Sequence, residues 1–148
     1  MTAPGRRGIT LPPSSHASLI RDASFAEGPL AGLLSGLEVV RPERLALVVG
    51  GDMPELQRPV LEEMLRTAGD ADGEAVALRE GGRLHPLPCV VGAGAAATAA
   101  RGLLAGGQRS LRAMLESLRL TVIEEDVWTP LDPGRRTLVD VDELPDLR

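Results

Sequence analysis

An uninterrupted apolar run from Leu45 to Val49 is the feature of this sequence that most restricts its fold. A strand with one face on solvent alternates apolar and polar residues, whereas a strand buried on both faces is apolar throughout. Strands of the second kind are typical of parallel sheets that are covered by helices on both sides. Gly50-Gly51 ends the run, and a helical pattern at 59–68 follows. The sequence therefore predicts an α/β fold, with a mostly parallel sheet sandwiched by helices.

The rest of the chain continues this alternation of strands and helices. Strands are expected at 17–20, 45–49, 74–78, 84–91, 121–123 and 138–141, with a Gly81-Gly82 turn between the third and the fourth. Helices are expected from Pro29 to before Pro42, at 59–68 with Gly69 as the stop, at 93–104, and after a Ser110 cap. Residues 1–16 are rich in Pro, Gly and Ser and are expected to be disordered, so the predicted domain covers 17–148.

The core of this domain must be built almost without aromatic side chains. Apolar residues make up 43% of the chain, but Phe25 and Trp128 are the only aromatic residues. Leu, Val and Ala are therefore expected to fill thin layers between the helices and the sheet. Cys89 is the only cysteine, which excludes an internal disulfide and a Cys-rich metal site.

Charge and hydropathy exclude several classes of protein. The 16 basic residues are all Arg, they are scattered among acidic residues, and the net charge is −5. Nucleic-acid binding needs a clustered basic face, so no nucleic-acid partner is expected. No run of 18 apolar residues predicts a membrane span, and residues 1–15 lack the apolar stretch of a secretory signal. The expected location is the cytoplasm.

Acidic residues follow several of the predicted strands. Asp22 and Asp52 each come just after an apolar run, and Asp140 and Asp142 lie at the end of the last one. Ligands of open α/β sheets bind beyond the carboxyl ends of the strands, and Mg²⁺ prefers a few carboxylates together with phosphate oxygens. Aspartates at such places also cap helices and form turns. The residues alone leave both interpretations open.

Two further motifs are candidates for ligand contact. Gly28, Pro29, Leu30, Ala31 and Gly32 open a helix, whose free N–H groups attract anions. His85 and Pro86 lie within a predicted strand. With no second His or Cys nearby, His85 is a poor metal ligand and is more typical of a structural or rim position.

In chain order, these motifs resemble one family. They are IRD at 20–22, GPLAGL at 28–33, VVGGDMP at 48–54, GRLHPL at 82–87, RSLR at 109–112 and LVDVD at 138–142. From about Leu19 to Leu147 the chain resembles molybdenum cofactor guanylyltransferases, which have the nucleotide-diphospho-sugar transferase-like fold. The resemblance implies Mg²⁺-dependent transfer of GMP from GTP to the terminal phosphate of molybdopterin cofactor.

The resemblance also implies a role for each motif. Asp52 is the implied catalytic residue and Mg²⁺ ligand, and Asp142 is a second implied metal ligand. Asp22 and the loop Gly28–Gly32 would bind the guanine nucleotide. Asp140, His85 and Pro86 would lie on the side of the acceptor, molybdopterin cofactor. Other molybdenum cofactor proteins are further candidate partners.

The sequence departs from this family at one important place. Family members begin with a strand and a Gly-rich phosphate loop of the form LAGGxSxRMGxDK, and nothing like it stands in residues 1–21. We therefore expect the fold to lack the first strand-loop-helix unit, to have an exposed sheet edge, and to be impaired in transfer. The second acid of LVDVD is also followed by Glu-Leu-Pro instead of Thr-Pro.

Several interpretations of this departure remain open. The missing motif could be encoded upstream of a wrongly chosen start codon. The chain could instead be an inactive paralogue, or a binding module that carries molybdopterin or pairs with another chain. A cytidylyltransferase of the same superfamily is the remaining alternative, because the base selector lies partly in the missing segment.

Overall fold

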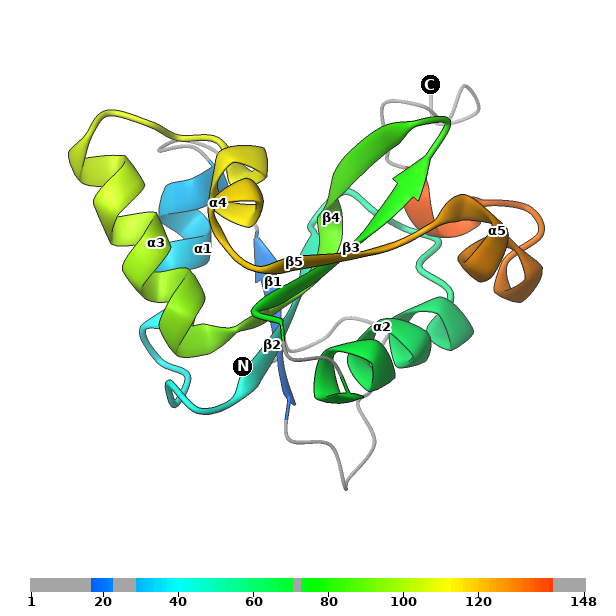
Figure 1. Cartoon of the computed structure of the whole chain (residues 1–148), viewed down its shortest axis with the longest axis horizontal. Coiled ribbons are helices and arrows are strands. Elements are labelled where there is room, and N and C mark those ends of the chain that lie inside the picture. The colour runs from blue at the N-terminus through cyan, green and yellow to red at the C-terminus, as the bar shows by residue number, and fades with distance from the viewer. Residues whose placement is uncertain (1–16, 23–28, 71–72, 140–148) are drawn as a thin grey trace.

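The computed structural model describes residues 17–22, 29–70 and 73–139, which form a five-stranded sheet with helices on both faces (Figure 1). The strands are β1 (Ala17–Asp22), β2 (Leu45–Gly50), β3 (Ala75–Glu80), β4 (Arg83–Gly92) and β5 (Leu120–Ile123). The α-helices are α1 (Pro29–Leu37), α2 (Arg58–Asp70), α3 (Ala93–Ala105), α4 (Leu111–Ser117) and α5 (Glu125–Trp128). Two 3₁₀ turns, η1 (Thr129–Leu131) and η2 (Arg136–Leu138), follow α5.

The strand order confirms the expected mostly parallel sheet. The order is β1-β2-β4-β3-β5, and β1, β2, β3 and β5 all run in the same direction. β4 is antiparallel to both of its neighbours, because it returns from β3 through a tight hairpin. The carboxyl ends of the four parallel strands and the start of β4 consequently lie along one edge of the sheet.

The apolar run that predicted a doubly buried strand does form one. Along β2, Ala46 and Val48 pack into a core layer with α1, α3 and α4, and Leu47 and Val49 pack into a second layer with α2 and Trp128. Figure 1 shows these two groups of helices on opposite sides of the sheet. Alternate residues of β3 divide in the same way, so the central strands are apolar because neither face meets water.

The first core layer is aliphatic, as expected, and the second is built around one aromatic side chain. Trp128 is fully buried in the second layer, and its indole Nε1–H donates a hydrogen bond to the carbonyl oxygen of Arg79 at 2.9 Å. That bond satisfies the polar atom of a ring that otherwise contributes apolar contact. Phe25 lies outside the described residues.

The hairpin between β3 and β4 has a two-residue turn followed by an irregular stretch. Gly81 and Gly82 have φ values of 59° and 78°, which is the left-handed backbone that a type I′ turn requires. Further along, Ala77 pairs with Cys89 but its neighbour Leu78 pairs with His85, so the residues 86–88 form a bulge. Pro86 and Pro88 have no N–H for a sheet ladder, which explains why regular pairing stops there.

Three expected boundaries are wrong. The helix expected to run from Pro29 to Pro42 ends already at Leu37, and turns follow it. Gly69 does not stop its helix, because α2 continues through it to Asp70. The strand expected at 138–141 is not formed at Leu138, which belongs to the 3₁₀ turn η2. Here the Asp132 carboxylate accepts hydrogen bonds from the backbone N–H groups of Arg136 and Thr137, at 3.1 and 2.8 Å, and folds the chain into a turn. Residues 140–141 lie outside the described ranges.

The other expected elements are confirmed to within a few residues. Ser110 caps α4, because its Oγ accepts a hydrogen bond from the N–H of Ala113 at 3.1 Å. β1 is an edge strand of the described sheet and pairs with β2. In the described ranges, no helix is both long and apolar enough to span a bilayer.

The buried Asp132 carboxylate makes stability dependent on pH. Burial raises the pKa of Asp132, but the hydrogen bonds from the backbone and side chain of Thr137 and from Arg136 outweigh it, so the net shift is downward. A lowered pKa means that the stabilisation is present above the unfolded value of about 3.9 and is lost as the pH falls through the folded value.

We expect Asp132→Asn to lower the free energy of unfolding at pH 7 by about 1–3 kcal/mol, because a buried, charge-assisted pair of hydrogen bonds is lost. The difference between wild type and variant should begin to shrink below about pH 4 and should disappear as the pH falls through the lowered folded pKa, where the wild-type carboxylate becomes protonated. Urea unfolding at pH 7 and at pH 3 measures both values. A difference that is the same at both pH values would contradict this account.

Candidate functional site

The edge formed by the carboxyl ends of the parallel strands brings several sequence-predicted residues together. Asp22 is the last residue of β1, and its register partner is Gly50, the last residue of β2. Asp52 follows two residues later, in the turn after β2. The register therefore places the backbone of Asp22 beside the turn that carries Asp52. The side chain of Asp22 is outside what the structure describes.

The Asp52 side chain folds back over the end of its own strand. A Cβ placed on Gly50 would stand 3.0 Å from Asp52 Oδ1 and 3.1 Å from Met53 Cγ. Met53 is buried, and its N–H donates to the carbonyl oxygen of Gly50 at 3.3 Å. Asp52 is half-buried. The absence of a side chain at Gly50 is therefore what lets the carboxylate occupy this position.

Helix α1, which carries most of the motif at 28–32, covers the face of the sheet to which Gly50 belongs. Residues 46, 48 and 50 of β2 share one face because side chains alternate along a strand, and α1 packs on that face through Leu30 and Leu33. Since β1 and β2 are parallel, α1 must return the chain from the carboxyl edge to the amino edge. The start of α1, at Pro29, therefore lies toward the edge that carries Asp52.

Within the predicted loop 28–32, the structure describes the last four residues. Pro29 is the first helical residue, Leu30 is fully buried in the core, and Ala31 and Gly32 are half-buried. Leu30 is thus a packing residue, which leaves backbone groups and its neighbours for any ligand contact. Gly28, Asp140 and Asp142 lie outside the described residues.

His85 lines an open cavity of about 590 Å³ at the same edge of the sheet. One wall is the β3–β4 hairpin, and the other is the segment around η2. The lining residues are Glu80, Gly81, Arg83, His85, Gly134, Arg135, Leu138 and Val139. Pro86 lies next to His85, in the bulge of β4. His85 is half-buried there, whereas the sequence left a structural and a rim position open.

Charged groups of both signs meet at this cavity. Arg135 Nη1 donates to Glu80 Oε2 at 3.0 Å and to Glu125 Oε2. His85 Nε2 lies 3.7 Å from Glu80 Oε1. The backbone N–H of Gly81 donates to Glu125 Oε1 at 2.8 Å, and this bond, followed by that from Arg135, lowers the pKa of Glu125. The cavity thus has an ordered ionic rim at neutral pH.

The donor chemistry at Asp52 fits a magnesium ion that shares its coordination with a substrate. Across the described residues, no group of three or more His, Cys, Asp or Glu side chains is arranged to hold a metal. Mg²⁺ does not need one, because it is commonly bound by one or two carboxylates, with water and phosphate oxygens as the other ligands. A half-buried carboxylate at the end of a buried strand supplies that kind of ligand.

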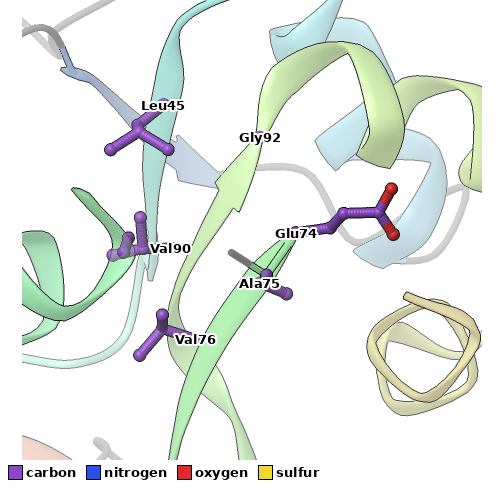
Figure 2. A pocket seen from close by; sticks show the side chains of 8 residues that line it. Leu45, Glu74, Ala75, Val76, Val90 and Gly92 are labelled. Atoms are coloured by element: carbon purple, nitrogen blue, oxygen red, sulfur yellow. The ribbon is translucent and has the colours of Figure 1, made fainter. Parts of the chain in front are cut away.

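A second, much smaller cavity lies at the opposite edge of the sheet. It measures about 10 Å³, which is room for about one water molecule, and it is lined by residues that include Leu45, Val76 and Val90. Figure 2 shows the Glu74 carboxylate pointing away from these three side chains. Its size and its apolar lining make it a packing gap, and it carries no candidate site.

A family model described as the MobA-like NTP transferase domain matches residues 5–123. That match covers most of the chain and includes β1, α1 and the turn with Asp52. The chain belongs to the MobA-like NTP transferase family. The expectation drawn from the sequence motifs is thereby confirmed at the level of the family.

Two curated relatives are similar to this MobA-like chain in sequence. A "Probable molybdenum cofactor guanylyltransferase" of Chloroflexus aggregans is 29% identical over 138 residues, which are 92% of this chain and 65% of the relative. A molybdenum cofactor guanylyltransferase of Pseudomonas syringae pv. tomato is 34% identical over 109 residues, or 74% and 53% of the two chains. The chain thus spans about half to two thirds of the length of these relatives.

Solved structures agree with the fold of this family. Molybdopterin-guanine dinucleotide biosynthesis protein A from Archaeoglobus fulgidus superposes with a TM-score of 0.69 at 21% identity, over 80% of this chain and 58% of that one. The 2-C-methyl-D-erythritol 4-phosphate cytidylyltransferase of Francisella tularensis gives 0.52 at 11% identity, over 74% and 67%. These likenesses confirm the nucleotide-diphospho-sugar transferase-like fold.

The sequence reasoning did not find the ionic rim of the cavity. One part of the rim could have been predicted from the Gly-Gly turn. A two-residue turn makes the flanking residues Glu80 and Arg83 register partners. No local pattern could have paired Glu80 with Arg135, since 55 positions separate them in the sequence. That contact depends on where η2 lies against the hairpin.

Gly50→Ala tests whether space at the strand end holds Asp52 in place. We expect a loss of about 1 kcal/mol in the free energy of unfolding, because the new methyl group displaces Asp52 or Met53 by a few tenths of an ångström. Gly69→Ala is the matched control: it lies in α2 with nothing within 4 Å, and should stabilise by about 0.4–1 kcal/mol. Urea unfolding of both variants measures the difference. Equal changes in the two variants would exclude crowding at Gly50.

Proposed function

We propose that this protein transfers GMP from GTP to molybdopterin cofactor in a Mg²⁺-dependent reaction. The observation that carries the proposal is the position of Asp52, held at the end of β2 over Gly50, the register partner of Asp22, in a chain of the MobA-like family. The names of the curated relatives support guanylyl transfer to this cofactor. The cytoplasm, where GTP is available, is the proposed location.

The reaction requires two anions to meet, since a phosphate oxygen of the acceptor attacks the α-phosphorus of GTP and pyrophosphate leaves. Mg²⁺ bound by Asp52, with Asp142 as second proposed ligand, would offset their repulsion. A phosphate nucleophile is already ionised, so the protein needs no general base. What remains for its side chains is to position the two substrates and to restrict their motion.

On the proposed donor side, Asp22 and the residues 28–32 at the start of α1 would contact the nucleotide. The N–H groups of a helix start are unpaired and carry partial positive charge, which suits phosphate oxygens or the edge of a base. The chain has no Lys, so any cationic contact to the triphosphate must come from Arg. Leu30 would act here only by anchoring the helix in the core.

On the proposed acceptor side, the cavity beside His85 is large enough for a small molecule. Its volume of about 590 Å³ is within the range of roughly 300–1,000 Å³ that ligand pockets occupy. Asp140 directly follows Val139, which lines the cavity. Arg83 lines it as well and brings an exposed positive charge that suits an anionic acceptor. We propose that Pro86 acts by shaping β4 next to this cavity.

Asp52→Ala should abolish GMP transfer while the fold remains intact, because the metal ligand is lost but no buried apolar contact is removed. Glu116→Ala is the control, since it removes an exposed carboxylate from α4. Product formation with Mg-GTP and molybdopterin cofactor, together with circular dichroism, measures both properties. Retained transfer by Asp52→Ala would remove this residue from the metal role.

The same assay decides whether the 148-residue chain is itself active. It should be run on the 148-residue chain and on the chain extended by the codons upstream of Met1. We propose that the 148-residue chain is impaired, because its sequence contains no Gly-rich phosphate loop. Equal, steady transfer by both proteins would contradict this proposal.

Thermal unfolding with nucleotides separates the alternative functions. A ligand at 100 times its Kd stabilises by about 2.7 kcal/mol, which corresponds to a rise in Tm of roughly 5–10 °C. A guanylyltransferase predicts this rise with Mg-GTP and a smaller one with Mg-CTP. The cytidylyltransferase alternative predicts the reverse order, and an inactive paralogue or binding module predicts no change with either nucleotide.

A further inference from the structure

Arg135 has an uncommon backbone conformation for a residue with a side chain. Its φ is 55°, and in the described ranges the other residues with positive φ are all glycines. Left-handed backbone is uncommon for residues with a Cβ, because the Cβ then crowds the neighbouring carbonyl oxygen. Gly134, which could adopt this conformation without strain, stands one position earlier. The strain at Arg135 is offset by the bond from its backbone N–H to the carbonyl oxygen of Asp132, at 2.8 Å, together with the contacts of its side chain.

The Arg135 side chain joins two carboxylates from different elements. Its Nη1 donates to Glu80, at the end of β3, and to Glu125, at the start of α5. Glu125 in turn accepts from the N–H of Gly81 in the hairpin turn. The network connects the segment before η2 to the hairpin and to α5. The hydrogen bonds that Arg135 donates to Glu80 and then to Glu125 raise the pKa of Arg135, so the guanidinium stays charged at any pH that the fold tolerates.

This network contributes little to the stability of the fold. The exposed fractions of the three side chains are 45% for Arg135, 28% for Glu80 and 35% for Glu125. Ion pairs this accessible to water are screened and contribute little net stabilisation. A gain in stability from these ion pairs therefore does not explain why a residue with strained backbone stands at position 135. Strain of this kind is concentrated at ligand-binding and catalytic sites.

The network lies where it sets the shape of the cavity. Arg135 and Val139 line one wall, and Glu80 and His85 line the other. Between Arg135 and Val139 the chain is held by short bonds, including the one from Val139 N–H to the carbonyl oxygen of Arg136 at 3.0 Å. A displacement of Arg135 would therefore be transmitted along this short segment toward Val139.

We propose that Arg135 is a positioning residue that fixes the η2 wall of this cavity against the β3–β4 hairpin, for binding of an anionic acceptor. The part of this inference that concerns the acceptor rests on the proposed function. The guanidinium need not touch the substrate, because its Nη1 donates to Glu80 and Glu125. Its effect passes through the backbone of residues 135–139.

The test compares Arg135→Gln with Arg135→Lys and with Arg136→Gln as the matched control. Arg136 is adjacent, exposed and paired with Glu55 at 3.5 Å, and it does not line the cavity. Hydrogen exchange at the N–H groups of Arg136, Thr137 and Val139 measures how often this wall of the cavity opens, and it needs no substrate. The fluorescence of Trp128, the only Trp, and the Tm report whether the core is intact.

We expect Arg135→Gln to exchange at these amides at least about tenfold faster, with the Tm and the Trp128 emission unchanged. In the active protein, KM for molybdopterin cofactor should rise about tenfold while KM for GTP stays constant. Arg135→Lys should show smaller changes in both the exchange rate and the KM for molybdopterin cofactor, because Lys keeps the positive charge but lacks the planar guanidinium that can donate to two carboxylates. Arg136→Gln should change neither.

Unchanged hydrogen exchange in Arg135→Gln would overturn the positioning role. Faster exchange with an unchanged KM for the acceptor, or with a change in KM for GTP instead, would overturn the link to acceptor binding. Absence of any transfer in the wild-type protein and in its upstream-extended form would count against the proposed function and with it the acceptor link. The exchange measurement would still decide the positioning role in that case.

Discussion

The fold depends on burying both faces of its central strands with small aliphatic side chains. β2, β3 and the second half of β4 contribute alternate residues to two separate core layers. The layer under α3 is rich in alanine on both the helix and the sheet, so helix and strands approach closely without large side chains between them. These three strands occupy the interior positions of the described sheet, where helices cover both faces.

This arrangement also determines where the polar residues of the site can lie. With both faces covered, the functional side chains are confined to the edge at which the parallel strands end, as is general for open α/β sheets. Because β4 is antiparallel, its hairpin turn reaches the same edge. One rim of the sheet therefore carries Asp52 after β2 and the ionic groups around Glu80 after β3.

Sequence reasoning recovered much of the fold because the signals were local. The doubly apolar run of β2, the Gly81-Gly82 turn and the Ser110 cap each act within a few residues, and each is confirmed. The strand expected at Leu138 failed because the Asp132 carboxylate binds two backbone N–H groups and folds the chain into a turn. That effect depends on the conformation of the Asp-Pro-Gly turn, which an apolar pattern cannot reveal.

The candidate site was predictable to a smaller extent, for a related reason. Asp52 could be found because strand ends can be read from the sequence, whereas its contact with Gly50 needed coordinates. The hydrogen bond between Arg135 and Glu80 could not be predicted, because it joins residues that are far apart in the sequence. The roles of Asp22, Asp140 and Asp142 stay predictions, because their side chains lie outside the described structure.

The prolines of β4 have a consequence for the shape of any substrate. Regular pairing between β2 and β4 ends at Val48 and Cys89, and Pro86 and Pro88 provide no N–H group that could continue the ladder at their positions. The sheet is thus split at its carboxyl edge, with Asp52 on one side of the split and the His85 cavity on the other. For the proposed transfer, an acceptor held in the cavity would have to reach across this split to bring its phosphate to Asp52.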